Sequence, residues 1–362
     1  MFTSSLSFMD RRRSFQFIGT GTAALILGRR IFAEQPAATR SHWVWIRPNQ
    51  QASDAVLTDR FRMFKSYGIH GVFIEGYHER FFRLAHQAGL STHLWMWTLN
   101  RGDQWIRENH PEWYAVNRKG ESCADHPPYV DYYRWLCPNR PEVGDYLAQT
   151  VREHLKKPYV QGIHLDYVRF CDVILPVELW PNYKLVQTAE LPEFDYCYCE
   201  TCRTAYREQT GKDPLDIPYP SDQFSWKKFR YDAVTKLVNR LADLVHQQRK
   251  TITAAVFPTP EIAKRLVRQD WVRWKLDAVC PMVYHNFYLE PESWIGEAVE
   301  QGVYELNGRR PLYAGLYLPA FQEINQFRTG VSLALQQGAK GVSLFGDVTE
   351  DHLRVLQSIP AH

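Results

Sequence analysis

One stretch of the sequence combines the residue types that acid–base chemistry requires. Gly162–Arg169 has the pattern of a short buried strand in which apolar residues face one side while His164 and Asp166 face the other. A strand buried on both faces is normally apolar throughout. Parallel α/β folds carry their chemistry at the carboxyl ends of strands, so Asp166 is the first candidate catalytic residue. The alternative is a structural aspartate that pairs with Arg169.

Seven other short apolar runs resemble this strand and alternate with segments whose apolar residues recur at helical spacing. The other predicted strands are His42–Arg47, Gly71–Glu75, Ser91–Thr98, Thr251–Phe257, Ala278–Tyr284, Pro311–Leu318 and Lys340–Phe345. Strands that alternate with helices favour parallel pairing. Eight such units in roughly 320 residues predict a (β/α)8 TIM barrel of the α/β class, with a doubly wound open sheet as the alternative. No glycine-rich phosphate loop follows any predicted strand, which disfavours nucleotide binding.

Two predicted connections are much longer than the others. Residues 99–159 follow the third strand and residues 168–230 follow the fourth. Loops longer than about 15 residues are uncommon unless they have a function. We therefore expect both to wall a cleft over the barrel mouth. We find no repeat and no linker, so residues 40–362 are predicted to form a single barrel domain.

The first 33 residues have the pattern of an export signal. Arg12-Arg13-Ser14-Phe15 precedes a mildly apolar segment, which is typical of a twin-arginine signal peptide. The segment is about half the roughly 20 residues that a membrane-spanning helix needs. An uncleaved amphipathic anchor is the alternative. The pattern predicts a periplasmic or secreted protein without a stable transmembrane segment.

The charge of the chain argues against nucleic-acid binding. Residues 1–33 contain five arginines and one aspartate, so they account for more than the whole net charge of +3 and leave the remainder at about −1. The remainder has no basic run that would bind a phosphate backbone. The balance of charge therefore gives no support for nucleic-acid binding.

Aromatic residues make up 14% of the chain, and several fall on the polar row of a predicted strand. Trp95 and Trp97 follow His93 on the third strand in this way. Flat indole faces near a barrel mouth suit sugar rings, whose C–H faces pack on aromatic rings. We take all three as candidate substrate-binding residues. The alternative is that large aromatics fill a wide barrel.

Three of the seven cysteines lie within six residues, as Cys197, Cys199 and Cys202. Thiols at this spacing can converge on one tetrahedral metal ion, and Zn²⁺ is the typical choice. Cys171 is the first candidate for a fourth ligand and Cys137 the second. The site offers no evident open position, so we expect a structural zinc. Disulfide-linked or free thiols are the alternative.

Several segments together resemble the glycosyl hydrolase-like 10 family of (β/α)8 proteins. These segments are Gly162–Arg169, Leu90–Trp95, His110–Trp113, Trp135–Val143, Asp270–Trp274 and Cys280–Tyr284. The resemblance spans roughly residues 42–347 and implies a carbohydrate substrate. It departs from the family pattern at Tyr167, where a second acid often follows the first, and at Trp97, where an Asn is common.

The cysteine cluster and Arg203–Arg207 also resemble the zinc loop of glycoside hydrolase family 42 β-galactosidases. The resemblance implies a glutamate on strand four and another on strand seven. This sequence has Asp166 on the fourth strand and no acid in Tyr313–Leu318. The catalytic residues of that family therefore do not carry over.

Glycoside hydrolysis requires two carboxyl groups that flank the scissile bond. We expect Asp166 to act as nucleophile or electrostatic stabiliser and Glu75 as proton donor, with Asp347 as a further candidate at the end of the eighth strand. Arg169 would keep Asp166 ionised by proximity. The side chains expected to bond substrate hydroxyls are those of Arg169, His164, Tyr284 and His285.

Three functional classes remain open. An exported glycoside hydrolase acting on a polysaccharide or cell-wall glycan is favoured. A carbohydrate-binding pseudoenzyme would keep the aromatic cleft without a working acid pair. A metal-dependent hydrolase would use the cysteine cluster, but catalytic zinc favours histidine and carboxylate ligands.

Overall fold

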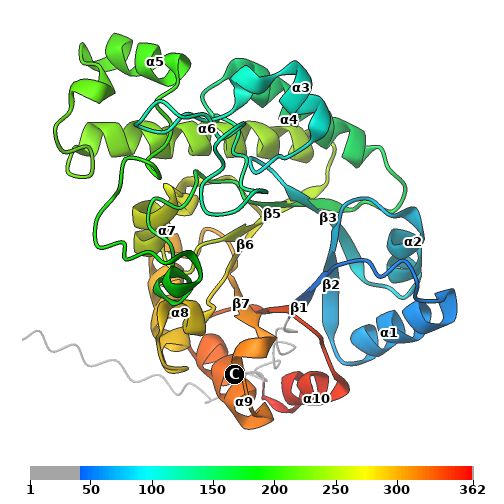
Figure 1. Cartoon of the computed structure of the whole chain (residues 1–362). Helices are drawn as coiled ribbons and strands as arrows, with labels where there is room; N and C mark the ends of the chain where they lie inside the picture. Colours follow the sequence, from blue (N-terminus) through cyan, green and yellow to red (C-terminus); the bar gives the residue numbers. More distant parts are fainter. Residues whose placement is uncertain (1–40, 361–362) are drawn as a thin grey trace, which may run out of the picture. The chain divides into compact units, whose positions relative to one another are not determined.

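The computed structural model describes residues 41–360. The predicted signal, residues 1–33, lies outside the described residues. Eight parallel strands make one sheet in the order β6-β5-β4-β3-β2-β1-β8-β7 (Figure 1). The strands are β1 (His42–Ile46), β2 (Ile69–Glu75), β3 (Ser91–Trp97), β4 (Gly162–Asp166), β5 (Thr251–Val256), β6 (Ala278–Pro281), β7 (Tyr313–Tyr317) and β8 (Gly341–Phe345). Isolated parallel bridges from Val279 to Leu312 and from Met282 to Gly315 join β6 to β7. The sheet thus curves into a ring, and the predicted (β/α)8 barrel is confirmed over the doubly wound alternative.

Helices follow the strands and surround the ring (Figure 1). They are α1 (Asp54–Ser66), α2 (Glu79–Gln87), α3 (Gln104–Asn109), α4 (Pro141–Leu155), α5 (Glu200–Thr210), α6 (Phe224–Gln247), α7 (Pro260–Val267), α8 (Trp294–Leu306), α9 (Ile324–Gln336) and α10 (Glu350–Ser358). Local sequence sets several starts. The Ser53 hydroxyl accepts the Val56 N–H before α1, and the Thr259 hydroxyl accepts the Ile262 N–H before α7. Prolines at the first positions of α4 and α7 lack only an N–H that would have no partner in the helix.

The predicted strands match the observed ones closely, with differences at their ends. β4 ends at Asp166 because Tyr167 adopts a left-handed conformation with φ of 48°. This conformation is uncommon for a residue with a large side chain, and it turns the chain sharply beside the carboxyl group. β6 ends at Pro281, since the chain then turns into a 3-10 helix, η5 (His285–Tyr288).

Two apolar cores hold the barrel together. One lies between the strands and the helices and is mostly aliphatic. The other fills the barrel interior with Trp43, Trp45, Phe73, Trp95, Ala255 and Cys280. Trp43 stacks on Phe73 with ring centroids 4.7 Å apart and an angle of 3°. Here the aromatic residues on the polar rows of the strands do fill a wide barrel.

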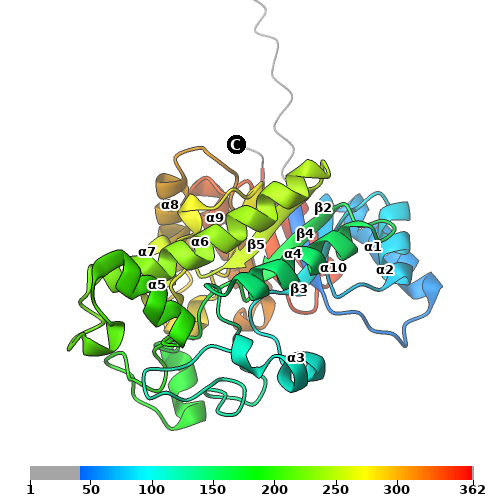
Figure 2. The ribbon, with the colours of Figure 1, turned by 90° about the horizontal axis from the view of Figure 1, so that it is seen from above.

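The parts of the two long connections that carry α3 and α5 lie beyond one end of the barrel, whereas α4 and α6 run alongside it (Figure 2). The first carries α3, a 3-10 turn η1 (Pro111–Trp113) and α4, and the second carries η2 (Val177–Tyr183), α5, η3 (Pro214–Asp216) and α6. An antiparallel bridge between Asn117 and Tyr196 and a 2.7 Å hydrogen bond from the Tyr198 N–H to the Val116 carbonyl join them. The predicted long loops after strands three and four therefore form one joined layer.

Candidate active site

A cavity of about 240 Å³ lies at the carboxyl ends of the strands. Its aromatic lining residues are Trp45, Trp95, Trp97, Tyr133, Tyr167, Phe257, Tyr284, Phe287, Tyr288, Tyr317 and Phe345. Its charged lining residues are Arg47, Asp166, Arg169 and Asp172. Tyr133 comes from the first long connection, and Arg169, Asp172, Pro176 and Leu179 come from the second. The expectation that these connections wall a cleft over the barrel mouth therefore agrees with the structure.

Asp166 is one of the two carboxyl groups that line this cavity. The Trp95 indole donates a 2.9 Å hydrogen bond to one carboxyl oxygen, and the Tyr167 N–H donates a 2.6 Å hydrogen bond to the other. Burial raises the pKa of Asp166 above its usual 3.8, and the negative charge of Glu75 raises it further. The hydrogen bonds and the Arg169 charge oppose this shift without cancelling it. Arg169 thus favours the ionised form of Asp166, as expected from the sequence, but burial has the larger effect on the pKa.

Glu75 lies at the end of β2, on the far side of β3 from Asp166. Its carboxylate pairs with the Arg47 guanidinium at 3.4 Å, and its side chain is 30% exposed. Arg47 lies over the Trp95 ring, 5.9 Å from its centroid. Glu75 is therefore linked to Asp166 through Arg47 and Trp95, although it does not itself line the cavity.

Asp347 does not join the other two acids. Its side chain is 90% exposed and lies 3.6 Å from the Arg60 guanidinium. Gly346, with φ of 127°, turns the chain after β8 ends at Phe345. The strand end thus points Phe345, not the acid, into the cavity.

Asp172 is an acid that the sequence analysis missed. It is buried, lines the cavity, and accepts a 2.7 Å hydrogen bond from the buried Arg169 guanidinium. Burial raises the pKa of Asp172, while the charge and hydrogen bond of the adjacent guanidinium oppose that shift. The Arg169 guanidinium also lies over the Trp135 ring at 4.6 Å. The i, i+3 spacing of opposite charges after a predicted strand was the available signal.

We expect Asp172→Ala to lower the free energy of unfolding by about 3 kcal/mol, because it leaves a buried arginine without its counter-charge. Urea unfolding measures the change. The double variant Asp172→Ala, Arg169→Met should recover part of the loss. A double variant whose loss of unfolding free energy exceeds the sum of the losses in the two single variants would contradict this account of the pair.

The two strand histidines are not where the sequence analysis expected them. His164 and His93 are wholly enclosed in the barrel interior and do not line the cavity. The reason is position along the strand, since both residues lie deeper in the barrel than Asp166 and Trp97. Burial lowers the pKa of His93 to about 3 and that of His164 well below its usual range.

This burial predicts an acid-sensitive fold. Each histidine stays neutral in the folded chain but binds a proton below pH 6.5 when the chain unfolds. Stability is therefore lost as the pH falls from 6.5, by up to about 1.4 kcal/mol per pH unit for each histidine. Urea unfolding at pH 7, 6, 5 and 4 measures how the free energy of unfolding changes with pH. It should fall less steeply with decreasing pH in His164→Gln than in the wild type. Equal slopes would contradict the prediction.

Of the remaining substrate-binding candidates, three line the cavity and one does not. Trp95, Trp97 and Tyr284 line the cavity. His285 is buried outside it, with its ring 5.3 Å from that of Phe321. Its position after β6 predicted that it would line the cavity, but the η5 turn directs its ring toward Phe321, which lies in the segment after β7.

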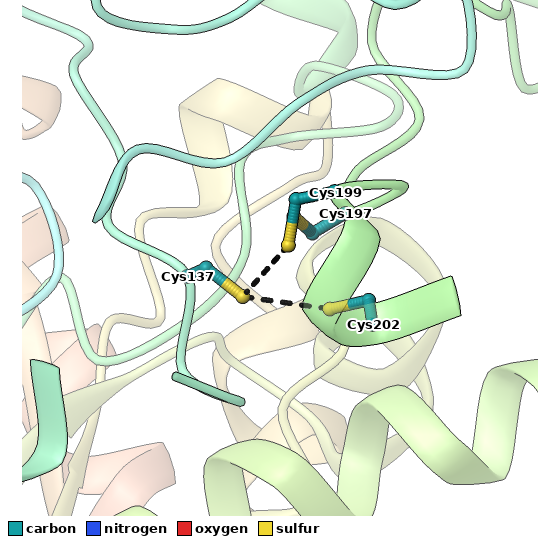
Figure 3. Close-up of side chains that lie close together, drawn as sticks. All are labelled: Cys137, Cys197, Cys199 and Cys202. Atoms are coloured by element: carbon teal, nitrogen blue, oxygen red, sulfur yellow. Dashed lines mark hydrogen bonds between the residues drawn. The ribbon is translucent and has the colours of Figure 1, made fainter. Parts of the chain in front are cut away.

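Four buried cysteines lie close together (Figure 3), and none of them lines the cavity. The sulfur atoms of Cys137, Cys197, Cys199 and Cys202 all lie within 4.8 Å of one another. Cys137 Sγ lies 3.4 Å from Cys202 Sγ and 3.7 Å from Cys199 Sγ. Tetrahedral Zn–S bonds of about 2.3 Å place sulfurs about 3.8 Å apart. The cluster could therefore hold a metal ion.

The fourth member of this cluster corrects the sequence analysis. Cys137, the second candidate, completes the cluster, and Cys171, the first candidate, is buried elsewhere. The segment that carries Cys171 turns toward α7, as the 3.1 Å hydrogen bond from the Phe170 N–H to the Val267 carbonyl shows. Because four sulfurs fill a tetrahedral site, this cluster lacks the open position of catalytic zinc.

Solved structures with the same fold include several carbohydrate-active enzymes. Gan42B, a GH42 β-galactosidase from G. stearothermophilus studied as a catalytic mutant, matches 89% of this chain with a TM-score of 0.62 and 12% identity. The β-galactosidase of the psychrophilic Marinomonas ef1 matches 89% with a TM-score of 0.58 and 11% identity. The chain spans 56% of the former and 62% of the latter.

The catalytic domain of β-amylase from Paenibacillus polymyxa matches 89% of this chain and 98% of its own length, with a TM-score of 0.58 and 13% identity. Identities this low establish a shared fold. No protein-family model and no curated protein matches the chain. The resemblance to the glycosyl hydrolase-like 10 family therefore stays a prediction.

None of the helices within residues 41–360 combines the length and apolar character needed to cross a membrane.

Proposed function

We propose that this protein is a glycoside hydrolase that acts on a polysaccharide at the Asp166 cavity. The observation that carries the proposal is a carboxyl group of raised pKa, oriented by two hydrogen bonds inside an aromatic-walled cavity. Aromatic faces suit sugar rings, and a raised pKa suits a proton donor near neutral pH. Solved enzymes of the same fold that act on glycosides are consistent with it.

We assign the proton-donor role to Asp166 and the role of nucleophile or base to Glu75. These roles are the reverse of those expected from the sequence. The negative charge of Glu75 contributes to the raised pKa of Asp166, and glycosidases use two carboxyl groups, one as acid and the other as nucleophile or base. Arg47 is the counter-charge that accompanies the Glu75 carboxylate.

The twin-arginine-like leader supports export, and we include cell-wall glycans among the proposed substrates for that reason. We also propose that the four-cysteine cluster holds a structural zinc ion. The sulfur spacing and the two donors to sulfur, the Val116 N–H on Cys197 at 3.4 Å and the Asn139 amide on Cys202 at 3.2 Å, fit thiolate ligands.

A carbohydrate-binding protein without catalysis is the second candidate. The observation in its favour is that Glu75 is paired with Arg47 and lies outside the cavity lining, while β7 ends without an acid. Aromatic walls alone would still bind a glycan.

Release of reducing ends from a panel of polysaccharides, including peptide-free peptidoglycan, tests the proposal. The chain without residues 1–33 is incubated with each glycan, and its retention on the same immobilised glycans is measured. Cleavage of at least one glycan is expected. Retention without cleavage would favour the binding protein. If no glycan is either cleaved or retained, both proposals are refuted.

A further inference from the structure

A chain of hydrogen bonds runs through the barrel interior from the cavity wall. The Trp45 indole on β1 donates to His164 Nε2 on β4 at 2.8 Å, and His164 Nδ1 lies 2.8 Å from the Thr253 hydroxyl on β5. The same hydroxyl lies 3.4 Å from His93 Nδ1 on β3, and His93 Nε2 lies 2.8 Å from the Thr251 hydroxyl. Trp45 is the member that lines the cavity.

The indole fixes where the neutral His164 ring carries its proton, because an indole N–H can only donate. His164 Nε2 must therefore present its lone pair, which places the proton of the neutral ring on Nδ1. Nδ1–H then donates to the Thr253 hydroxyl, which also lies within hydrogen-bond distance of His93 Nδ1. If His164 were protonated, its Nε2–H would face the Trp45 indole N–H, and neither group could accept a hydrogen bond from the other. The tautomer of His164 is therefore fixed by its two partners.

The surroundings of His164 keep it in this arrangement. Its ring stacks on Phe73 with centroids 3.7 Å apart at 17°, and it has no exposed surface. Gly162 makes room for the lower part of the chain, since a Cβ there would lie 2.6 Å from both His93 Nε2 and the Thr251 hydroxyl. The site is thus built for this set of polar groups, within a core that is otherwise apolar.

We propose that His164 is a positioning residue that fixes the indole plane of Trp45, so that this wall of the cavity is preformed for a sugar ring. The inference rests on the proposed carbohydrate-binding function of the cavity. Stacking depends on the orientation of the ring, and a ring held by a hydrogen bond loses less freedom when a ligand binds. His164 itself does not touch the substrate.

Two substitutions at one position test the proposal. His164→Leu removes the acceptor for the indole, whereas His164→Gln offers an amide oxygen in its place. In protein labelled with ¹⁵N-tryptophan, the Trp45 indole resonance is assigned by its loss in Trp45→Phe. We expect His164→Leu to shift this resonance and to raise the KM for the cleaved glycan about tenfold, with a smaller change in kcat. His164→Gln should restore most of both properties.

An unchanged Trp45 resonance or an unchanged KM in His164→Leu would overturn the proposal, as would equal losses in the two variants. If the wild type cleaves no glycan, the proposed hydrolase is refuted, and the Kd for the retained glycan takes the place of KM. If His164→Leu does not fold, Thr253→Val removes the next link instead. It should shift the same resonance, and a resonance that stays in place would overturn the proposal.

Discussion

Asp166→Asn is expected to reduce kcat/KM for the cleaved glycan by about 10³-fold. General acid catalysis contributes typically 10²–10⁴-fold, and an amide cannot donate the proton that a carboxylic acid transfers to the leaving group. The amide can still accept the hydrogen bond from the Trp95 indole. Binding should therefore change much less than kcat, and the initial rate of reducing-end release measures the loss.

Asp351→Asn is the matched control, because Asp351 is an exposed acid on α10 that does not line the cavity. It should keep wild-type activity. Thermal unfolding of both variants shows that each is folded. Equal cleavage by Asp166→Asn and the wild type would contradict the assignment and move the chemistry to another carboxyl group.

The assignment of Asp166 as proton donor also predicts the direction in which kcat/KM changes with pH. A proton donor must be protonated in the free enzyme, so kcat/KM should fall as the pH rises through the pKa of Asp166. Burial and the Glu75 charge raise that pKa, so the fall should come at a higher pH than for an ordinary aspartate. A rate that instead rises through this range would indicate that Asp166 acts as a carboxylate.

The barrel could be predicted from the sequence because its strands are short, apolar and separated by helical patterns. A parallel strand covered on both faces leaves this signal regardless of its partners. The ends of strands were less predictable. That β4 stops at Asp166 depends on the positive φ of Tyr167, a conformation that the sequence pattern did not indicate.

The site could be predicted only in part, because alternation along a strand gives the face of a residue but not its depth. His164 and Asp166 share a row, yet one is sealed in the barrel and the other lines the cavity. Contacts between distant loops were also out of reach. Cys137 meets Cys199 because two long connections pair with each other, whereas proximity in the sequence favoured Cys171.

Loss of a single ligand of the cysteine cluster is expected to destabilise the protein and release the metal together. Structural zinc supplies folding free energy directly, with apparent values of about 10–16 kcal/mol in small domains. The barrel core remains without the metal, so we expect Cys199→Ser to cost roughly 5 kcal/mol, or a fall in Tm of about 10 °C. Metal analysis of the purified protein should find one zinc ion per wild-type chain and much less in the variant.

Cys171→Ser provides the matched control, since it changes a buried thiol in the same connection that does not belong to the cluster. It should keep the full zinc content. A Cys199→Ser protein that melts like the wild type and still holds one equivalent of zinc would refute a structural site. Wild-type protein that contains no metal and forms disulfides among these cysteines would refute it too.

Because the cluster joins the two connections that wall the cavity, chelation should also lower glycan affinity at temperatures where the barrel is still folded. Affinity and zinc content should then fall together, and an affinity unchanged after complete removal of the metal would separate the cluster from the cavity.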